Sequence, residues 1–253
     1  MRSLSLLIAF FLLLFSATPA TSAEQKGSPL AMDLSAHDVA ITTSFVGSNL
    51  LLFGTTGGKG EVIVVVRGPQ HDEIVRRKDK VAGIWVNKDS VTFKDVPSLY
   101  TVASSKPIEK ILKKSDRSTY KIGFAHLPTE TDGTETVGPD EIPAFRDALI
   151  RRKQAKDLYS EDPKAVTFIK SGLFRLNISL PSNITAGDYE VDTFLIRNGK
   201  VASAQTTTLP VQKVGFEAGV YNFAHQYSFF YGVLAVIIAI VAGWMANAAF
   251  RKG

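Results

Sequence analysis

The sequence predicts a mainly β fold: an immunoglobulin-like β-sandwich with a helical insertion, followed by one C-terminal transmembrane helix. Short runs rich in Val, Ile, Phe and Thr alternate with turn residues along most of the chain, as in sandwiches. Residues 107–160 carry helix signals instead, which indicates an insertion into the β pattern. Residues 229–250 form an apolar stretch long enough to cross a bilayer.

The N-terminus has the three parts of a secretory signal. A positive start at Arg2 is followed by an apolar run over residues 4–15 and by small residues up to Ala23. The run is shorter than the ~20 residues that a membrane span needs. Cleavage after Ala23 fits best and cleavage after Ala20 is the alternative. In either case, and even if this segment stays as an anchor, the middle of the chain is exported.

The first half of the outer domain, which begins at residue 24, predicts strands. Runs at 39–45 and 50–53 flank the turn residues 47–49 and predict a hairpin. Residues 61–66, Glu-Val-Ile-Val-Val-Val, form a continuous apolar run and predict a central strand. Further strands are expected at 83–87, 91–96 and 99–103, with a solvated edge at 73–78.

The middle of the domain predicts helices. Pro107 starts a short helix over 107–114, and a second helix runs from Asp140 to about Tyr159. The second half of that helix carries Arg151, Arg152 and Lys153. These side chains could contact anionic headgroups or an acidic partner. The alternative, which is the commoner case, is a solvated helix face.

The last part of the domain is β again. Strands are expected at 165–170 and 173–180, and a hairpin at 189–196 and 201–211 turns at Asn198-Gly199. The helical insertion would then cover one end of the sandwich. Residues 215–228 link the sandwich to the membrane and contain aromatic residues suited to its interface.

The apolar stretch at 229–250 predicts a helix of about 33 Å, which matches a hydrocarbon core of ~30 Å. Tyr227 and Tyr231 mark one interface, and Arg251 and Lys252 follow the other end. Positive residues stay in the cytoplasm, so residues 24–226 lie outside, 227–250 span the membrane and 251–253 form a cytoplasmic tail.

The predicted membrane helix carries a row of small residues. Ala235, Ala239, Gly243 and Asn247 recur every four residues and form a seam that ends in an amide. Such a seam lets a second helix approach closely, and an amide in lipid favours a hydrogen-bonding partner. The alternative is that Ala and Gly are simply frequent in membrane helices.

Composition excludes several classes of function. The chain has 253 residues and a net charge of +5. Removing Arg2, Arg251 and Lys252 from the 29 Lys and Arg leaves 26 against 24 Asp and Glu, so the outer part offers no strongly basic surface for nucleic acid. There is no cysteine, which excludes disulfides, thiolate metal sites and a cysteine nucleophile.

No constellation of residues predicts catalysis, a metal or a cofactor. None of the four histidines has a partner at the helical spacing of a metal pair, although Asp33, His37 and Asp38 are close in sequence. Residues 57–60, Gly-Gly-Lys-Gly, lack the spacing of a phosphate loop and predict a hairpin turn. Trp85 lies in a predicted strand and is either core, which we favour, or a surface anchor. The expectation is a protein that is not an enzyme.

Several motifs resemble the transmembrane protein family of alphaproteobacteria (Alph_Pro_TM). They are Arg67-Gly68-Pro69, residues 83–87, residues 96–105 and the closing runs 230–232 and 242–244. The resemblance covers nearly the whole chain. It implies a bacterial inner membrane and a periplasmic domain, and it supplies no catalytic residue.

Together these patterns favour a single-pass inner-membrane protein whose periplasmic domain is an interaction or accessory module, for a transporter or an envelope complex. Its expected partners are the membrane and another transmembrane helix, from a second copy or from a multi-pass protein. A periplasmic domain that binds or senses a small ligand is the alternative.

Overall fold

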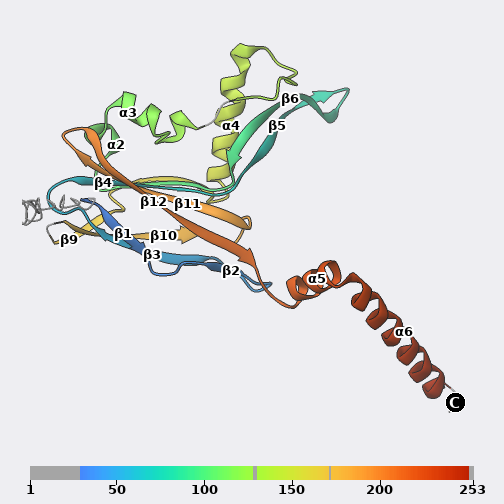
Figure 1. Cartoon of the computed structure of the whole chain (residues 1–253). Helices are drawn as coiled ribbons and strands as arrows, with labels where there is room; N and C mark the ends of the chain where they lie inside the picture. Colours follow the sequence, from blue (N-terminus) through green and yellow to red (C-terminus); the bar gives the residue numbers. More distant parts are fainter. Residues whose placement is uncertain (1–28, 128–129, 171, 251–253) are drawn as a thin grey trace, which may run out of the picture.

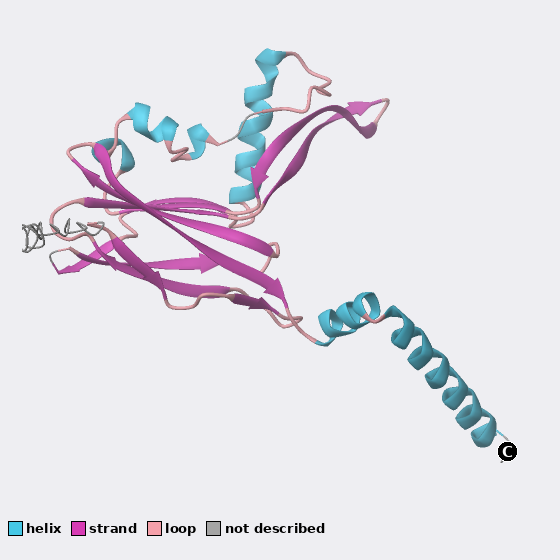
Figure 2. Cartoon of the chain, viewed as in Figure 1, coloured by secondary structure: helices cyan, strands magenta, loops and turns pink. Residues whose placement is uncertain are grey.

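The computed structural model describes residues 29–127, 130–170 and 172–250 (Figure 1). The predicted signal peptide, residues 1–23, and the predicted cytoplasmic tail, residues 251–253, lie outside the described residues. Strands make up most of the regular structure, followed by one long C-terminal helix (Figure 2). The prediction of a mainly β fold with a C-terminal apolar helix is therefore confirmed.

One sheet has four antiparallel strands in the order β1-β3-β10-β9. Their bounds are β1 (Ala31–Leu34), β3 (Ser48–Thr55), β9 (Thr167–Lys170) and β10 (Leu173–Leu180). Burial alternates along β3, where Leu50 and Leu52 are buried and Leu51 is exposed. Only one face of this sheet therefore contributes to the core.

The second sheet has six strands in the order β2-β12-β11-β4-β7-β8. Their bounds are β2 (Val39–Ile41), β4 (Glu61–Arg67), β7 (Tyr100–Ser104), β8 (Tyr159–Pro163), β11 (Gly187–Arg197) and β12 (Lys200–Lys213). Both edge strands, β2 and β8, pair in parallel with their neighbours. The predicted central strand is confirmed as β4, which lies between β11 and β7. The narrower label of an immunoglobulin-like sandwich is not confirmed.

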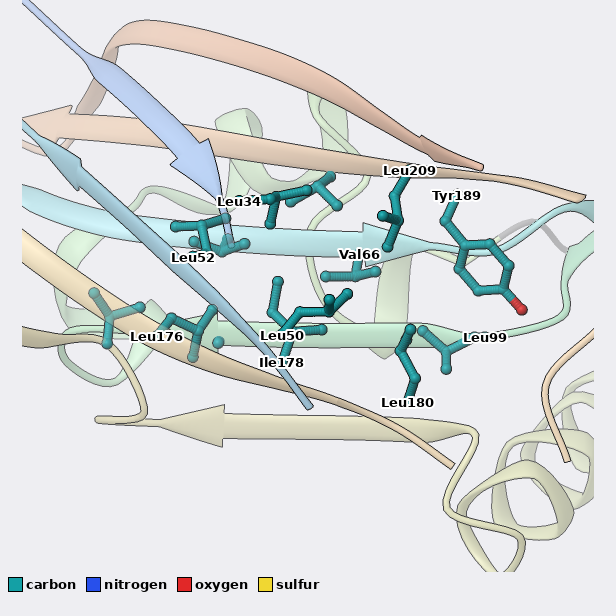
Figure 3. Close-up of a cluster of buried hydrophobic side chains, with 14 of the residues drawn as sticks. Leu34, Leu50, Leu52, Val66, Leu99, Leu176, Ile178, Leu180, Tyr189 and Leu209 are labelled. Carbon is teal, nitrogen blue, oxygen red and sulfur yellow. The ribbon is translucent and has the colours of Figure 1, made fainter. Parts of the chain in front are cut away.

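The two sheets pack face to face around one hydrophobic core. Leu50 and Leu52 of β3 and Leu176 and Ile178 of β10 lie in the same cluster as Val66 of β4 (Figure 3). Val62 and Val64 of β4 belong to this cluster as well. Their burial supplies most of the hydrophobic free energy that holds the sheets together.

A second core lies on the other face of the six-stranded sheet. Ile63 and Val65 of β4 point into it, so β4 is buried on both faces, which explains its unbroken apolar sequence. The layer above contains short helices, a longer helix and the base of a hairpin. Their bounds are α2 (Ile108–Ile111), α3 (Lys114–Thr119), η1 (Phe124–His126), η2 (Pro139–Glu141) and α4 (Ile142–Gln154).

The position of this helical layer corrects one expectation. The helices were expected to cover one end of the sandwich. Instead, Phe145 and Leu149 of α4 and Ile108 and Ile111 of α2 pack into the core on the outer face of the six-stranded sheet. The molecule therefore has three layers, with the six-stranded sheet in the middle (Figure 1).

The hairpin of β5 (Gln70–Val81) and β6 (Ile84–Pro97) forms a separate two-stranded sheet. The sequence predicted two strands at 83–87 and 91–96, but β6 is continuous. Its inner part packs in the second core through Val91 and Phe93, and its outer part extends away from the rest of the domain (Figure 2).

Three other expectations, two about hairpins and one about the end of a helix, were wrong. Residues 39–45 and 50–53 do not form a hairpin, because β2 pairs with β12 while β3 pairs with β1 and β10. Residues 57–60 do not turn a hairpin either, because they connect β3 in one sheet with β4 in the other. The helix expected to reach Tyr159 ends at Gln154, and Tyr159 begins β8.

Two helices follow β12. The linking segment forms α5 (Phe216–Gln226), and α6 (Ser228–Phe250) forms the predicted apolar helix. Between β12 and α5 stands Gly215, with φ +141 and open space where a side chain would begin. The anchor helices thus leave the sandwich through a short link (Figure 1).

Candidate functional site

Helix α6 is long and apolar enough to cross a membrane over Ser228–Asn247. The described part of the chain buries none of this segment. In water such a helix would expose large apolar side chains on every side, including Ile237, Ile240 and Val241. A bilayer removes that surface from water, so the sequence of α6 suits lipid on all its faces.

The predicted seam lies along one side of α6. Residues four apart on an α-helix are rotated by about 40° from one another, so Ala235, Ala239, Gly243 and Asn247 form a slowly turning row. A side chain added at Gly243 would meet no atom within 4 Å. The amide of Asn247 has no hydrogen-bond partner among the described residues. The seam is therefore open and unpartnered within the described chain.

Trp85 is on the surface, which corrects the preference for core. Its side chain is 65% exposed, and its neighbours Ile84 and Val86 are exposed as well. Alternation along β6 was expected to bury one face. At this point of the hairpin no other layer of the described chain covers either face.

The three basic residues of α4 do not share one surface. Arg151 and Arg152 are exposed, but Lys153 is buried because it follows Phe145 and Leu149 on the inner side of the helix. The Lys153 ammonium forms an ion pair with Glu73 of β5. Burial acts to raise the pKa of Glu73, but hydrogen bonds from Lys153 and His71 outweigh it and leave that pKa below its ordinary value.

A polar pocket of about 230 Å³ lies between the six-stranded sheet and the helical layer. It is lined by side chains from several elements, among them Arg67, Tyr100, Lys121, His126 and Glu190. The Tyr100 hydroxyl donates to the Lys121 carbonyl at 2.9 Å and accepts from the Gly123 amide at 2.9 Å. Burial raises the pKa of Tyr100 to about 12, so it is neutral at physiological pH.

Of the charged side chains in this pocket, Arg67 is engaged by other groups. Arg67 pairs with Asp192 and also donates to the carbonyl oxygens of Tyr120 and Lys121. The pKa of His126 is lowered by desolvation, assisted by the positive charges of Arg117 and Lys114. Arg67 therefore fixes the pocket wall, and a small polar ligand would find the carboxylate of Glu190, the ammonium of Lys121 and the hydroxyl of Tyr100 along that wall.

Two other histidines, His37 and His71, pair with nearby carboxylates. His37 lies 3.1 Å from Asp33, and both side chains are exposed; no contact links Asp38 to them. His71 lies 2.9 Å from Glu73. No group of three or more potential His, Cys, Asp or Glu ligands occurs among the described residues.

The comparison with known proteins decides the family. The family described as "Putative transmembrane protein (Alph_Pro_TM)" matches residues 29–252. The chain belongs to the Alph_Pro_TM family. The matched range takes in both sheets, the helical layer, the β5–β6 hairpin and α6 of this Alph_Pro_TM protein. No curated protein matches the chain.

Family membership and the one candidate span agree that the Alph_Pro_TM protein described here is a membrane protein. Two features of its structure were not expected from sequence. One is the pairing of Lys153 with Glu73, and the other is the exposed end of the β5–β6 hairpin.

Proposed function

We propose that this protein is a single-pass inner-membrane protein whose periplasmic domain is an interaction or accessory module, for a transporter or an envelope complex. The observation that carries the proposal is the open seam of α6, which ends in the unpartnered amide of Asn247. In lipid, small side chains allow close helix packing and an amide gains a hydrogen bond only from a partner.

The orientation follows from the charges at the end of α6. Arg251 and Lys252 come directly after the apolar helix, and cations at this position are retained in the cytoplasm. The sandwich precedes α6 and would then face the periplasm. A reporter that is active only outside the cytoplasm, fused after Gly253, should be inactive, and the same reporter placed before β1 should be active.

The partner of the seam is another transmembrane helix, from a second copy or from a multi-pass protein. The arc of α6 that holds the seam also carries the small residues Gly232 and Ala246, together with the larger Phe229 and Val236. The opposite side carries larger residues such as Ile237 and Val241. Small residues therefore gather on one side of α6, which is the side that a second helix could approach.

Co-purification from native membranes in mild detergent tests this role. Ala239→Leu and Gly243→Leu should each abolish recovery of the partner, because a leucine would hold the helices apart. Val241→Leu, on the other side of α6, should leave recovery unchanged. If both seam variants retain the partner as well as the unmodified protein does, the proposed contact is wrong.

A small-ligand function is the second candidate, and the pocket beside Tyr100 and Lys121 favours it. The pocket is smaller than the ~300–1,000 Å³ of most ligand sites, which limits it to a small polar molecule. A thermal-shift screen of small anions and sugars with the detergent-solubilised protein tests it. A ligand that stabilises the unmodified protein but not Lys121→Ala would support this function. Neither the interaction role nor the ligand-binding role requires catalysis.

A further inference from the structure

The outer end of the β5–β6 hairpin stands free of the domain (Figure 2). The last polar contacts between the hairpin and the helical layer are those of Arg77 with Glu141 and of Ser90 with Thr136. Within the described chain, no hydrogen bond or ion pair joins residues 78–88 to any other element. Ala82 and Gly83, both with positive φ, turn the hairpin at its end.

This free end is apolar. Val81 is 53% exposed and Ile84 is 68% exposed, and they pair across the turn. Trp85 and Val86 are exposed beside them. Four large apolar side chains around one turn are unusual on a surface in water and indicate a surface that becomes covered.

Cations stand directly behind the apolar end. Arg76, Lys78 and Lys80 alternate along β5, so they share one face at intervals of about 7 Å. Lys80 is the cross-strand partner of Trp85, which places the tryptophan on the same face. Arg77 and Lys88 have carboxylate partners, whereas these three cations have none among the described residues.

Protection of an edge strand explains only part of this pattern. Lysines on a free edge hinder pairing with other chains, and β5 has such an edge. Protection of the edge does not account for the exposed side chains of Ile84 and Trp85 at the turn, because exposed apolar side chains promote association with other chains. An apolar end backed by cations is instead the arrangement that suits the boundary between acyl chains and anionic headgroups.

The topology favours the bilayer over a soluble acidic partner. Strands β4 and β12 are both antiparallel to β11, so their last residues, Arg67 and Lys213, lie at the same end of the sheet. The hairpin follows β4 and the anchor helices follow β12. Hairpin and anchor therefore leave the sandwich at one end, where they diverge in Figure 1.

We propose that the end of the β5–β6 hairpin docks on the anionic bilayer that holds α6. Val81, Ile84, Trp85 and Val86 would enter the headgroup boundary, and Arg76, Lys78 and Lys80 would meet lipid phosphates. Rotation of the domain at Gly215 would bring the hairpin to the membrane, and a Cβ built on that residue would meet no atom of the described chain within 4 Å. The docking needs no partner helix, so it is independent of the seam.

Fluorescence of Trp85 tests the docking in the full chain. The sequence has two tryptophans, so Trp244→Phe makes Trp85 the single reporter. The protein is reconstituted into phosphatidylcholine vesicles with and without phosphatidylglycerol. With phosphatidylglycerol, Trp85 emission should shift to shorter wavelength and be quenched by brominated acyl chains.

Two double variants separate charge from general effects. Lys78→Gln with Lys80→Gln should abolish the shift and the quenching, whereas Lys110→Gln with Lys113→Gln removes the same charge from the helical layer and should change neither. Trp85 that stays water-exposed and unquenched in anionic vesicles would overturn the proposal. An emission shift of equal size in both lipids would also overturn the proposal. A shift that occurs only when other membrane proteins are added would overturn it too, because the hairpin would then bind a protein partner.

Discussion

An ion pair between buried Lys153 and partly buried Glu73 is one of the contacts that fasten the hairpin to the helical layer. Lys153 of α4 reaches Glu73 near the base of β5, and His71 adds a second contact to the same carboxylate. Lys153 is 7% exposed, so its ammonium group interacts mainly with this partner rather than with water. The pair fixes how α4 and the hairpin base pack, and through them the direction of the hairpin.

Replacing Lys153 should destabilise the domain. Lys153→Met keeps the length and apolar stem of the side chain but removes the charge and hydrogen bond, which we expect to cost about 2 kcal/mol. Chemical denaturation of the solubilised protein measures this. Arg152→Met, next to it but exposed, should change stability by less than about 0.5 kcal/mol. An equal loss in both variants would mean that the pair contributes nothing specific.

The same pair should make stability depend on pH in the acid range. The pKa of Glu73 is lowered from 4.5, so its contribution is complete above that value and is lost as the pH falls through the lowered pKa. Glu73→Gln has no such titration. Between about pH 6 and pH 3, the unmodified protein should therefore lose more stability than the variant. Parallel losses would show that Glu73 is not linked to folding.

At the scale of elements, the strands differ in whether one face or both faces are buried. Leu52 of β3 is completely buried, and Leu51 beside it is 36% exposed on the other face. Leu52→Ala should lower the free energy of unfolding by about 2–5 kcal/mol through lost contacts and a cavity. Leu51→Ala should cost less than about 1 kcal/mol. Thermal melts of the two variants compare the faces directly, and similar shifts would contradict the assigned register.

Local patterns predicted some elements well. The unbroken apolar run of β4 predicted a central strand, and packing on both of its faces is the cause of that run. Asn198 and Gly199, with φ values of +52 and +73, turn the predicted β11–β12 hairpin. In these cases the information lies within the segment itself.

Other elements depend on distant partners, which local patterns do not specify. The turn after β2 resembles that of a hairpin, yet β2 pairs with β12. Strand β8 has the polar sequence Tyr-Ser-Glu-Asp-Pro and exists because it pairs in parallel with β7. Alternation at Trp85 shows which residues share a face, but not whether another layer covers it. Lys153 was assigned to solvent by its charge, although its spacing from Leu149 places it inside.

For the whole molecule, α6 determines how it is held in the membrane. The protein should remain in the membrane pellet after extraction with alkaline carbonate, because the described chain buries no residue of the apolar window Ser228–Asn247 and lipid would cover it. Ile240→Arg places a charge near the middle of the helix, at a cost of about 3 kcal/mol, and should increase the extracted fraction. Lys200→Glu, a charge change in the sandwich, should not. Complete release of the unmodified protein would refute the membrane span.

The end of the sandwich opposite Lys213 has its own consequence. There, Arg197 donates to the carbonyl oxygens of Thr56 and Lys59 and ties the loop between the two sheets to the turn at Asn198 and Gly199. Since β12 runs from this turn toward the anchor, a peptide epitope inserted beside Gly199 would lie at the end of the sandwich away from the anchor. If the domain has the periplasmic orientation proposed above, an antibody would reach such an epitope on intact spheroplasts without touching the regions on which the proposed docking and assembly depend.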